Sequence, residues 1–296
     1  MAKENLTKME NIDASIREID FVTRFGRNWQ SLQDILGIMR PIKKTPGTQL
    51  VSYNATVTLE DGNVGEGEEI PYSLAEVSPV SYQDITLEKY AKAVSIEAVN
   101  KYGANVAVQK TDDAFLVELQ DKVMTAFYTF LLTGTLTSTE SSFQMAVAMA
   151  IGKVKDKFKA MHKDFTSIVV WVNTLDAYKY LGASELTVQN LFGIEYIENF
   201  MGADKLIISS DIPEGKVVAT PTENIDLYYI DPSDSEFAQL GLNYTVQGET
   251  NLIGFHVNGN YNTAVGEVFA LMGMALWAEY LDGIAVITVG GGDTSQ

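Results

Sequence analysis

The chain has 296 residues, 46% hydrophobic and 20% charged, values typical of a folded protein of one or two domains with a sizeable core. Its net charge of −18 disfavours general coating of a nucleic-acid backbone. With no cysteine and two histidines, it has no disulfide, thiolate nucleophile, cysteine-ligated metal or three-histidine metal site within one chain. No apolar signal core or bilayer-spanning run occurs, so we expect neither secretion nor membrane insertion.

The first 44 residues form a mildly basic arm on an acidic body. They contain eight Lys or Arg and six Asp or Glu, whereas residues 217–296 contain no Lys or Arg at all. Charge alone leaves two interpretations of the arm equally open. It is either a solvated N-terminal helix or a segment that contacts an acidic surface, either of its own chain or of a neighbouring chain. Its apolar residues recur at helical spacing, which predicts amphipathic pieces that cover a surface: Ile12, Ile16, Ile19, Val22, Leu32, Ile35, Leu36 and Met39.

Within residues 50–59, apolar and polar side chains alternate strictly from Val51 to Leu59, which predicts a β-strand. The glycine-rich and acidic stretch EDGNVGEGEE follows, and the alternation resumes at Ile70, Tyr72 and Leu74, beyond Pro71. This pattern predicts a long β-hairpin with an irregular tip. The segment QDITLEKYAKAVSI is predicted to continue as strand.

Two helices are predicted next, over 112–132 and 143–161, each with one apolar stripe. Asp112 is the expected N-cap of the first helix and Gly134 its expected stop. TSIVVWV is predicted as a buried strand, and Asn173 as the cap of a short helix after it. Further strands are predicted in KLIISSDIPEGKVVAT, with a turn between them, in NIDLYYID and over 240–289, which gives an α+β pattern.

The motifs that could carry chemistry are weak. Gly65 and Gly67 lack the third glycine and the following helix of a dinucleotide loop. Asp61 and Asn63 begin a sequence like a calcium loop, but its twelfth position is Tyr72 instead of glutamate. We therefore expect no cofactor, metal or catalytic residues.

A run of lysines on the second helix is either an anion-binding patch or a solvated face near a helix C-terminus, and we favour the solvated face. His256 is interpreted as a structural histidine, and His162 as an exposed one. The lysines of the run are Lys153, Lys155, Lys157, Lys159 and Lys163.

The ordered set of elements resembles the tailed-bacteriophage major capsid proteins of the Hong Kong 97 type, over about residues 20–290. VGEGEEIPYSLAEVSPVSYQDITLEKYAKAVSIEAVNKYG matches that family's extended loop and return strand, and DDAFLVELQDKVMTAFYTFLLTG looks like its spine helix. Three further passages resemble parts of that family's axial domain. They are SIVVWVNTLDAYKYL, LFGIEYI together with LIISSDIPEGKVVAT, and DGIAVITV.

The resemblance implies an α+β, Hong Kong 97-like capsid fold with four parts. These are an N-terminal arm (1–44), an extended β-hairpin loop (45–82), a peripheral domain with a spine helix and β-sheet (83–135 and 239–280), and an axial α/β domain (136–238 and 281–296). The stretch ENFMGADK is longer than the family pattern.

The implied function is that of a structural, non-enzymatic capsid protein, which self-assembles into pentamers and hexamers of an icosahedral phage shell around double-stranded DNA, without sequence-specific binding. The implied partners are further copies of the chain, a separate scaffold protein, a portal and decoration proteins. The implied location is the virion, after assembly in the bacterial cytoplasm. The expected intersubunit contacts are Ile16, Ile19, Phe21 and Trp29 in the arm and Val57, Leu59, Val64, Ile70 and Tyr72 in the loop.

Some relatives join their chains covalently through a lysine in the extended loop. No Lys or Arg lies between Thr45 and Glu88, so we expect no such cross-link here. Two other functions are compatible with the sequence: an encapsulin-type compartment shell of the same fold, and an acidic hydrolase. The hydrolase would require two carboxylates that face each other across a pocket.

Overall fold

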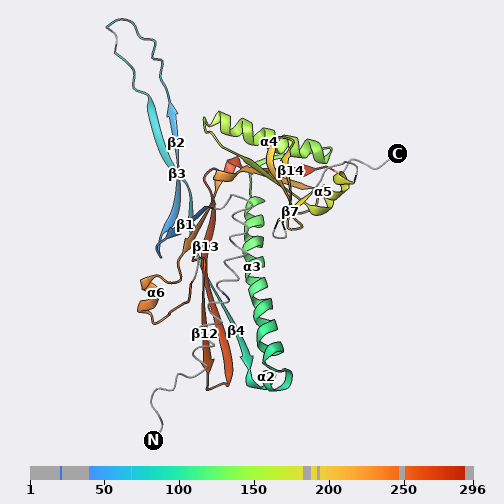
Figure 1. The fold of residues 1–296 in the computed structure, drawn as a ribbon. Coiled ribbons are helices and arrows are strands. Elements are labelled where there is room, and N and C mark those ends of the chain that lie inside the picture. Colours follow the sequence, from blue (N-terminus) through green and yellow to red (C-terminus); the bar gives the residue numbers. More distant parts are fainter. Residues whose placement is uncertain are drawn as a thin grey trace.

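The computed structural model describes residues 21, 40–67, 69–182, 188–191, 194–246 and 251–290. These residues form two sheets with their helices, and a two-stranded hairpin that projects past the rest of the chain (Figure 1). The helices are α2 (Ile96–Tyr102), α3 (Lys110–Leu131), α4 (Phe143–Ala160), α5 (Thr174–Leu181) and α6 (Ser235–Gln239), with a π-helix at Asn105–Gln109 and 3-10 turns at Thr222–Asn224 and Leu281–Gly283. None of the described helices is long and apolar enough to cross a membrane.

The first sheet has five strands in the order β1-β11-β13-β12, and β4 pairs with the same long strand β13. β4 runs along the first part of β13 and β11 along its last part, so β13 holds the sheet together. The bounds are β1 (Arg40–Lys44), β4 (Leu87–Ser95), β11 (Ile225–Ile230), β12 (Ile253–Asn260) and β13 (Val265–Ala278).

The second sheet has seven strands in the order β5-β14-β10-β6-β9-β8-β7. Its central strand β6 is buried on both faces, as its uninterrupted apolar sequence predicts. Ile168, Val170 and Val172 pack toward α4, and Val169 and Trp171 toward α3. The bounds are β5 (Leu136–Glu140), β6 (Ile168–Val172), β7 (Gln189–Leu191), β8 (Ile194–Phe200), β9 (Ala203–Ile208), β10 (Lys216–Pro221) and β14 (Ala285–Val289).

Helix α3 joins the two sheets through a single apolar stripe. Its buried residues Leu116, Leu119 and Val123 share one core with strands of the first sheet. Near its C-terminal end, the Phe127 ring meets the Trp171 ring of the second sheet edge-on, with centroids 5.9 Å apart. The predicted stripe is confirmed.

Asp112 is not the N-cap of α3, so that prediction is wrong. The π-helix at Asn105–Gln109 runs directly into α3, and Gln109 occupies the cap position without a side-chain hydrogen bond. Asp112 lies within the first turn, buried, and forms an ion pair with Lys92 of β4. The carboxylate therefore ties the helix to the first sheet.

The caps and strands predicted around the second sheet are confirmed. The predicted cap Asn173 accepts a hydrogen bond from the Leu175 amide at 2.8 Å. The structure adds a cap that was not predicted, Ser142, at the start of α4. The two strands of KLIISSDIPEGKVVAT form, but β6 lies between them, so they do not pair with each other. The ENFMGADK stretch is the tight turn from β8 to β9, with Asn199 and Met201 at positive φ.

The sheets also divide the chain differently from the predicted domains. β11 lies inside the predicted axial range 136–238, yet it pairs with β13 of the first sheet. β1 lies inside the predicted arm, yet it pairs with β11. Both differences arise because the pairing partner is distant in sequence, where local patterns carry no information about it.

We predict that Gly134→Ala lowers the free energy of unfolding by about 1–3 kcal/mol. An added Cβ would lie 2.6 Å from the Ile284 carbonyl oxygen, and a backbone atom cannot move aside cheaply. Gly152→Ala on α4 is the matched control, because a Cβ there meets nothing within 4 Å and alanine favours the helix. Urea unfolding of the unassembled chain measures both, and equal effects of the two variants would contradict this packing.

Candidate functional site: the exposed hairpin

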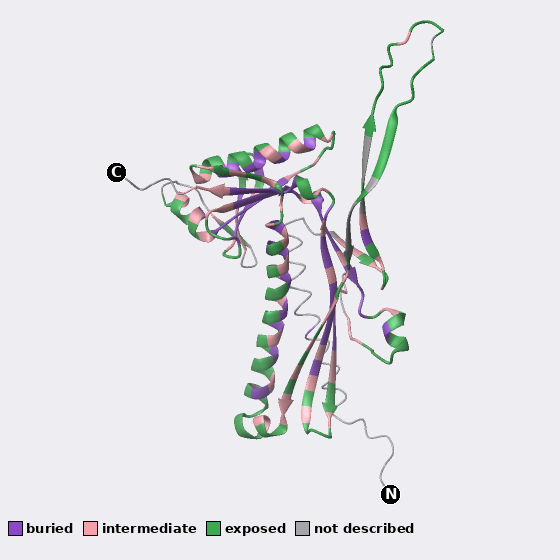
Figure 2. Cartoon of the chain, turned by 180° about the vertical axis from the view of Figure 1, so that it is seen from behind, coloured by how far each residue is buried: buried purple, intermediate pink, exposed green. Residues whose placement is uncertain are grey.

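The hairpin β2 (Gln49–Thr58) and β3 (Leu74–Asp84) is a ribbon with one apolar face. Directly paired residues share a face, and Tyr53 pairs with Pro79, Ala55 with Val77 and Val57 with Ala75. Tyr53, Val57 and Val77 remain 68%, 57% and 66% exposed. The described part of the chain therefore leaves this apolar face open to solvent, as the exposed colouring in Figure 2 shows for much of the hairpin.

The tip of the hairpin combines exposed apolar side chains with carboxylates. Leu59, Ile70 and Tyr72 are 80%, 69% and 93% exposed, while Val64 is half-buried. The Glu60 amide donates to Ser73 Oγ at 3.2 Å, which holds the two legs together beyond the last strand pair. Residues 45–88 contain eight acidic residues and no Lys or Arg, so the ribbon is uniformly negative.

The tip shows no metal geometry among its described residues. The Asn63 amide donates to Asp61 Oδ1 at 2.9 Å, which closes a local turn. Across the described ranges, no group of three or more His, Asp or Glu side chains is placed to hold a metal ion.

The base of the hairpin is fixed to the first sheet by an ion cluster. Lys43 lies near the end of β1, and its Nζ is 2.9 Å from Asp231 Oδ2 and 2.7 Å from Asp234 Oδ1. Burial acts to raise the pKa of Asp231, but hydrogen bonds from Ser233, Asn251 and Lys43 outweigh it and lower the pKa to about 2. The same carboxylates raise the pKa of Lys43. The entry strand of the hairpin is thus held electrostatically.

The exit from the hairpin is held by apolar packing. Ile85 and Leu87 pack against a small buried cluster of Ile230, Phe237 and Leu271. Gly273 of β13 permits this approach, since a Cβ there would lie 2.7 Å from a Leu87 methyl group. Both roots of the ribbon are therefore anchored in the same sheet.

The predicted contact residues fall into three groups. Val57, Leu59, Ile70 and Tyr72 are exposed on the hairpin, with Val64 half-buried among them. Phe21 is buried at 2% exposure and stacks on Phe255 of its own chain at 5.0 Å, so it is not available to a neighbouring subunit. Ile16, Ile19 and Trp29 lie outside the described residues.

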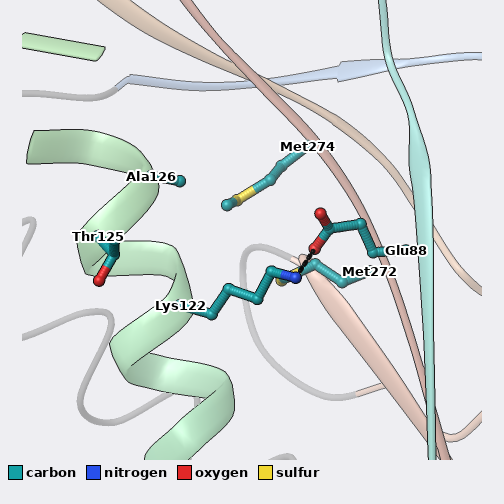
Figure 3. Close-up of a pocket in the computed structure, with 6 residues that line it drawn as sticks. All are labelled: Glu88, Lys122, Thr125, Ala126, Met272 and Met274. Carbon is teal, nitrogen blue, oxygen red and sulfur yellow. Dashed lines mark ion pairs between the residues drawn. The ribbon is translucent and has the colours of Figure 1, made fainter. Parts of the chain in front are cut away.

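A cavity of about 250 Å³ lies between α3 and the first sheet (Figure 3). It is lined by Glu88, Lys122, Thr125, Ala126, Met272 and Met274. Glu88 lies 3.6 Å from Lys122, and the Lys122 ammonium lies 4.9 Å from the centre of the nearby Tyr90 ring. Burial and the hydrogen bond to Glu88 raise the pKa of Tyr90. Glu88 is the one acid in the lining of this cavity, and its carboxylate faces the Lys122 ammonium and not a second acid.

An adjoining cavity of about 350 Å³ includes Glu118 and Asp121 in its lining. These two acids lie three residues apart on one helix, so they do not face each other across the cavity. A third cavity, of about 610 Å³, lies at the far end of the first sheet from the hairpin tip and has no acid in its lining. The opposed carboxylates of the hydrolase hypothesis are not found in these three cavities.

The remaining polar candidates do not line any of these three cavities. His162 is exposed, and the half-buried His256 ring stacks on Phe269 at 6.5 Å. On α4, Lys157 pairs with Asp282 at 2.5 Å, while Lys155 and Lys159 are exposed.

No protein-family model and no curated protein matches this chain. Its structure is similar to one from Mycobacterium phage Patience, with TM-score 0.55, 11% identity and coverage of 93% of this chain and 87% of that one. It is similar to the mature capsid of bacteriophage PhiM1, with TM-score 0.53, 7% identity and coverage of 85% of both chains. It is also similar to the holo-SrpI encapsulin of Synechococcus elongatus PCC 7942, with TM-score 0.48, 10% identity and coverage of 89% and 90%.

The chain therefore has an α+β, Hong Kong 97-like fold, as the sequence resemblance predicts.

We predict that stability falls between pH 5 and pH 2 and that Asp231 accounts for about 1–2 kcal/mol of the fall. Because its folded-state pKa is lowered to about 2, its contribution is complete above the ordinary pKa of 3.8 and disappears as the pH falls toward 2. Urea unfolding of Asp231→Asn should show a shallower pH dependence, whereas Glu236→Gln, an exposed acid on α6, serves as the control. Identical slopes for the wild type and Asp231→Asn would refute the ion cluster.

Proposed function

We propose that this chain is the major capsid protein of a tailed phage, which self-assembles into pentamers and hexamers of an icosahedral shell around double-stranded DNA. The observation that carries the proposal is the hairpin with one apolar face, which projects from a body of capsid fold and has no cover among the described residues. An isolated two-stranded ribbon is marginal in water, so such a face gains stability when it lies on a neighbour.

In this role the chain performs no catalysis, and its functional residues are those of the intersubunit contacts. Val57, Leu59, Val64, Ile70 and Tyr72 of the hairpin would make these contacts, together with Ile16, Ile19 and Trp29 of the arm. The acidic composition would keep packaged DNA from adhering to the shell wall, since both are negative. A separate scaffold protein, a portal and decoration proteins would complete a virion that assembles in the bacterial cytoplasm.

We predict that replacing residues 59–73 with an Asn-Gly turn abolishes particle formation while the subunit stays folded. The turn would close the two paired strands just past Thr58 and before Leu74, so the first sheet and its core are unaffected. Electron microscopy and light scattering of the protein, coexpressed with its neighbouring phage genes, measure assembly. Circular dichroism measures the fold. Normal particles from the shortened chain would disprove the assignment.

Two point variants test the same proposal in a chain of full length, in case the shortened chain does not fold. Val77→Asp places a charge on the apolar face of the ribbon, whereas Glu76→Gln changes the adjacent residue, whose side chain points to the opposite face. Only the first should suppress assembly. The nucleic-acid content of purified wild-type particles then separates a phage head from an encapsulin-type shell, which would hold a cargo enzyme instead of a genome.

A further inference from the structure

Helix α4 covers one face of the second sheet, and its outer face is the side turned away from that sheet. Figures 1 and 2 show α4 at the border of the molecule, with the second sheet on one side of it only. The residues of the outer face follow helical spacing and are all exposed. They are Met145, Ala148, Met149, Gly152, Lys155 and Lys159.

The first half of the outer face carries no charge. Residues 143–152 contain no Asp, Glu, Lys or Arg, although the helix packs through one side only. Met145 and Met149 are 50% and 40% exposed, and Ala148 lies between them. A surface helix normally carries charged or polar residues on its outward face. Exposed methionines are typical of surfaces that bind a partner, because their flexible side chains adapt to it.

Gly152 is a second sign of a partner. A Cβ at this position would meet nothing within 4 Å, so packing in the described part of the chain does not require a glycine here. Glycine in the interior of a helix also destabilises that helix relative to alanine. On an exposed face, however, a glycine lets the backbone of a second helix approach closely. The residue is therefore explained by an intermolecular contact.

The second half of the outer face is basic. Residues 153–163 contain five lysines and one acidic residue, in a chain whose net charge is −18. Lys155 and Lys159 are exposed and form no ion pair with the described residues. The Lys155 ammonium lies beside the turn from β8 to β9, because a Cβ on Gly202 would be 3.8 Å from it. Met201 of that turn is 45% exposed, so apolar surface continues next to the cation.

These features specify the chemistry of the partner. Its contact surface must be apolar opposite the methionines and acidic opposite the lysines. An amphipathic helix provides both in one element. Carboxylates are favoured at the N-terminal end of a helix by its dipole, and antiparallel packing places that end beside the basic C-terminal end of α4.

We propose that the outer face of α4 binds an acidic amphipathic helix of a second protein, antiparallel to α4, with its apolar side chains on Met145, Met149 and Gly152. The surface belongs to one copy of the chain, so this inference does not depend on the proposed shell function. A second α4 does not fit as the occupant. Antiparallel pairing would set the lysines of each copy against the uncharged half of the other, and parallel pairing would set lysines against lysines.

A synthetic peptide of 18 residues, the length of α4, provides the first test. It carries leucines at helical spacing on one side and glutamates in its first half, whereas a control peptide carries the glutamates in its second half. Isothermal titration calorimetry with the full-length, unassembled chain measures both dissociation constants. We expect the first peptide to bind at least tenfold more tightly, with an advantage that shrinks as salt screens the charges. Equal affinities, or no binding, would overturn the proposal.

Variants of the chain locate the peptide on α4. Lys155→Glu with Lys159→Glu should weaken binding about tenfold. Lys101→Glu with Lys110→Glu, at exposed lysines of α2 and α3, is the matched control and should leave binding unchanged. Gly152→Leu should also weaken binding about tenfold because it blocks close approach, but it should not lower the free energy of unfolding, since leucine favours the helix. Equal losses for both lysine pairs, or no loss with Gly152→Leu, would refute the site.

Photo-cross-linking identifies the natural occupant. A benzoylphenylalanine takes the place of Met149 in the full-length chain, which is expressed together with the genes that adjoin its own. Mass spectrometry then maps the cross-linked segment. We expect a segment of another protein with apolar residues at helical spacing and an excess of acidic residues. A segment without that chemistry, an adduct with another copy of this chain, or the absence of any adduct would overturn the proposal.

Discussion

The apolar stripe of α3 is the constraint on which the rest of the structure depends. One helix supplies Leu116 and Leu119 to the first sheet and Phe127 to the second, so the described sheets share a single continuous core. At 1.5 Å per residue, α3 is about 33 Å long, which sets the separation of the two ends of the body. A tightly packed core of this kind does not deform gradually, so the hairpin is anchored to a stiff support.

The completeness of that core explains why the ribbon has no cover within the described residues. The inward-facing apolar residues of the two sheets already pack in cores with α3 or α4, so these residues are not available to cover the hairpin. Full burial of a valine, leucine or isoleucine side chain contributes roughly 1.5–3 kcal/mol, and the exposed side chains of the hairpin would gain this contribution only upon association. Association must also offset lost translational freedom and the ordering of the tip, so several such side chains must act together.

Local patterns in the sequence were sufficient for most elements. The uninterrupted apolar run of β6, the Asn173 cap and the stripe of α3 all depend on residues close together in the chain. The sequence could not reveal the partner of Asp112, because Lys92 lies on another element. It could not place β11 in the first sheet for the same reason. The alternation over 50–59 indicated which residues share a face, but alternation carries no information about what covers that face.

The hairpin is also asymmetric in its backbone. Tyr53 pairs with Pro79 and Ser52 with Ser81, so Val80 forms a bulge in β3, and Pro79 beside it has no amide hydrogen to donate. Among the described strands, β2 and β3 pair only with each other. No other described strand therefore pairs with the outer backbone edge of either one. A proline and a bulge obstruct further strand addition along the edge of β3. Copies of the chain are thereby hindered from stacking ribbon on ribbon into an open fibre, the product that would compete with the proposed closed shell.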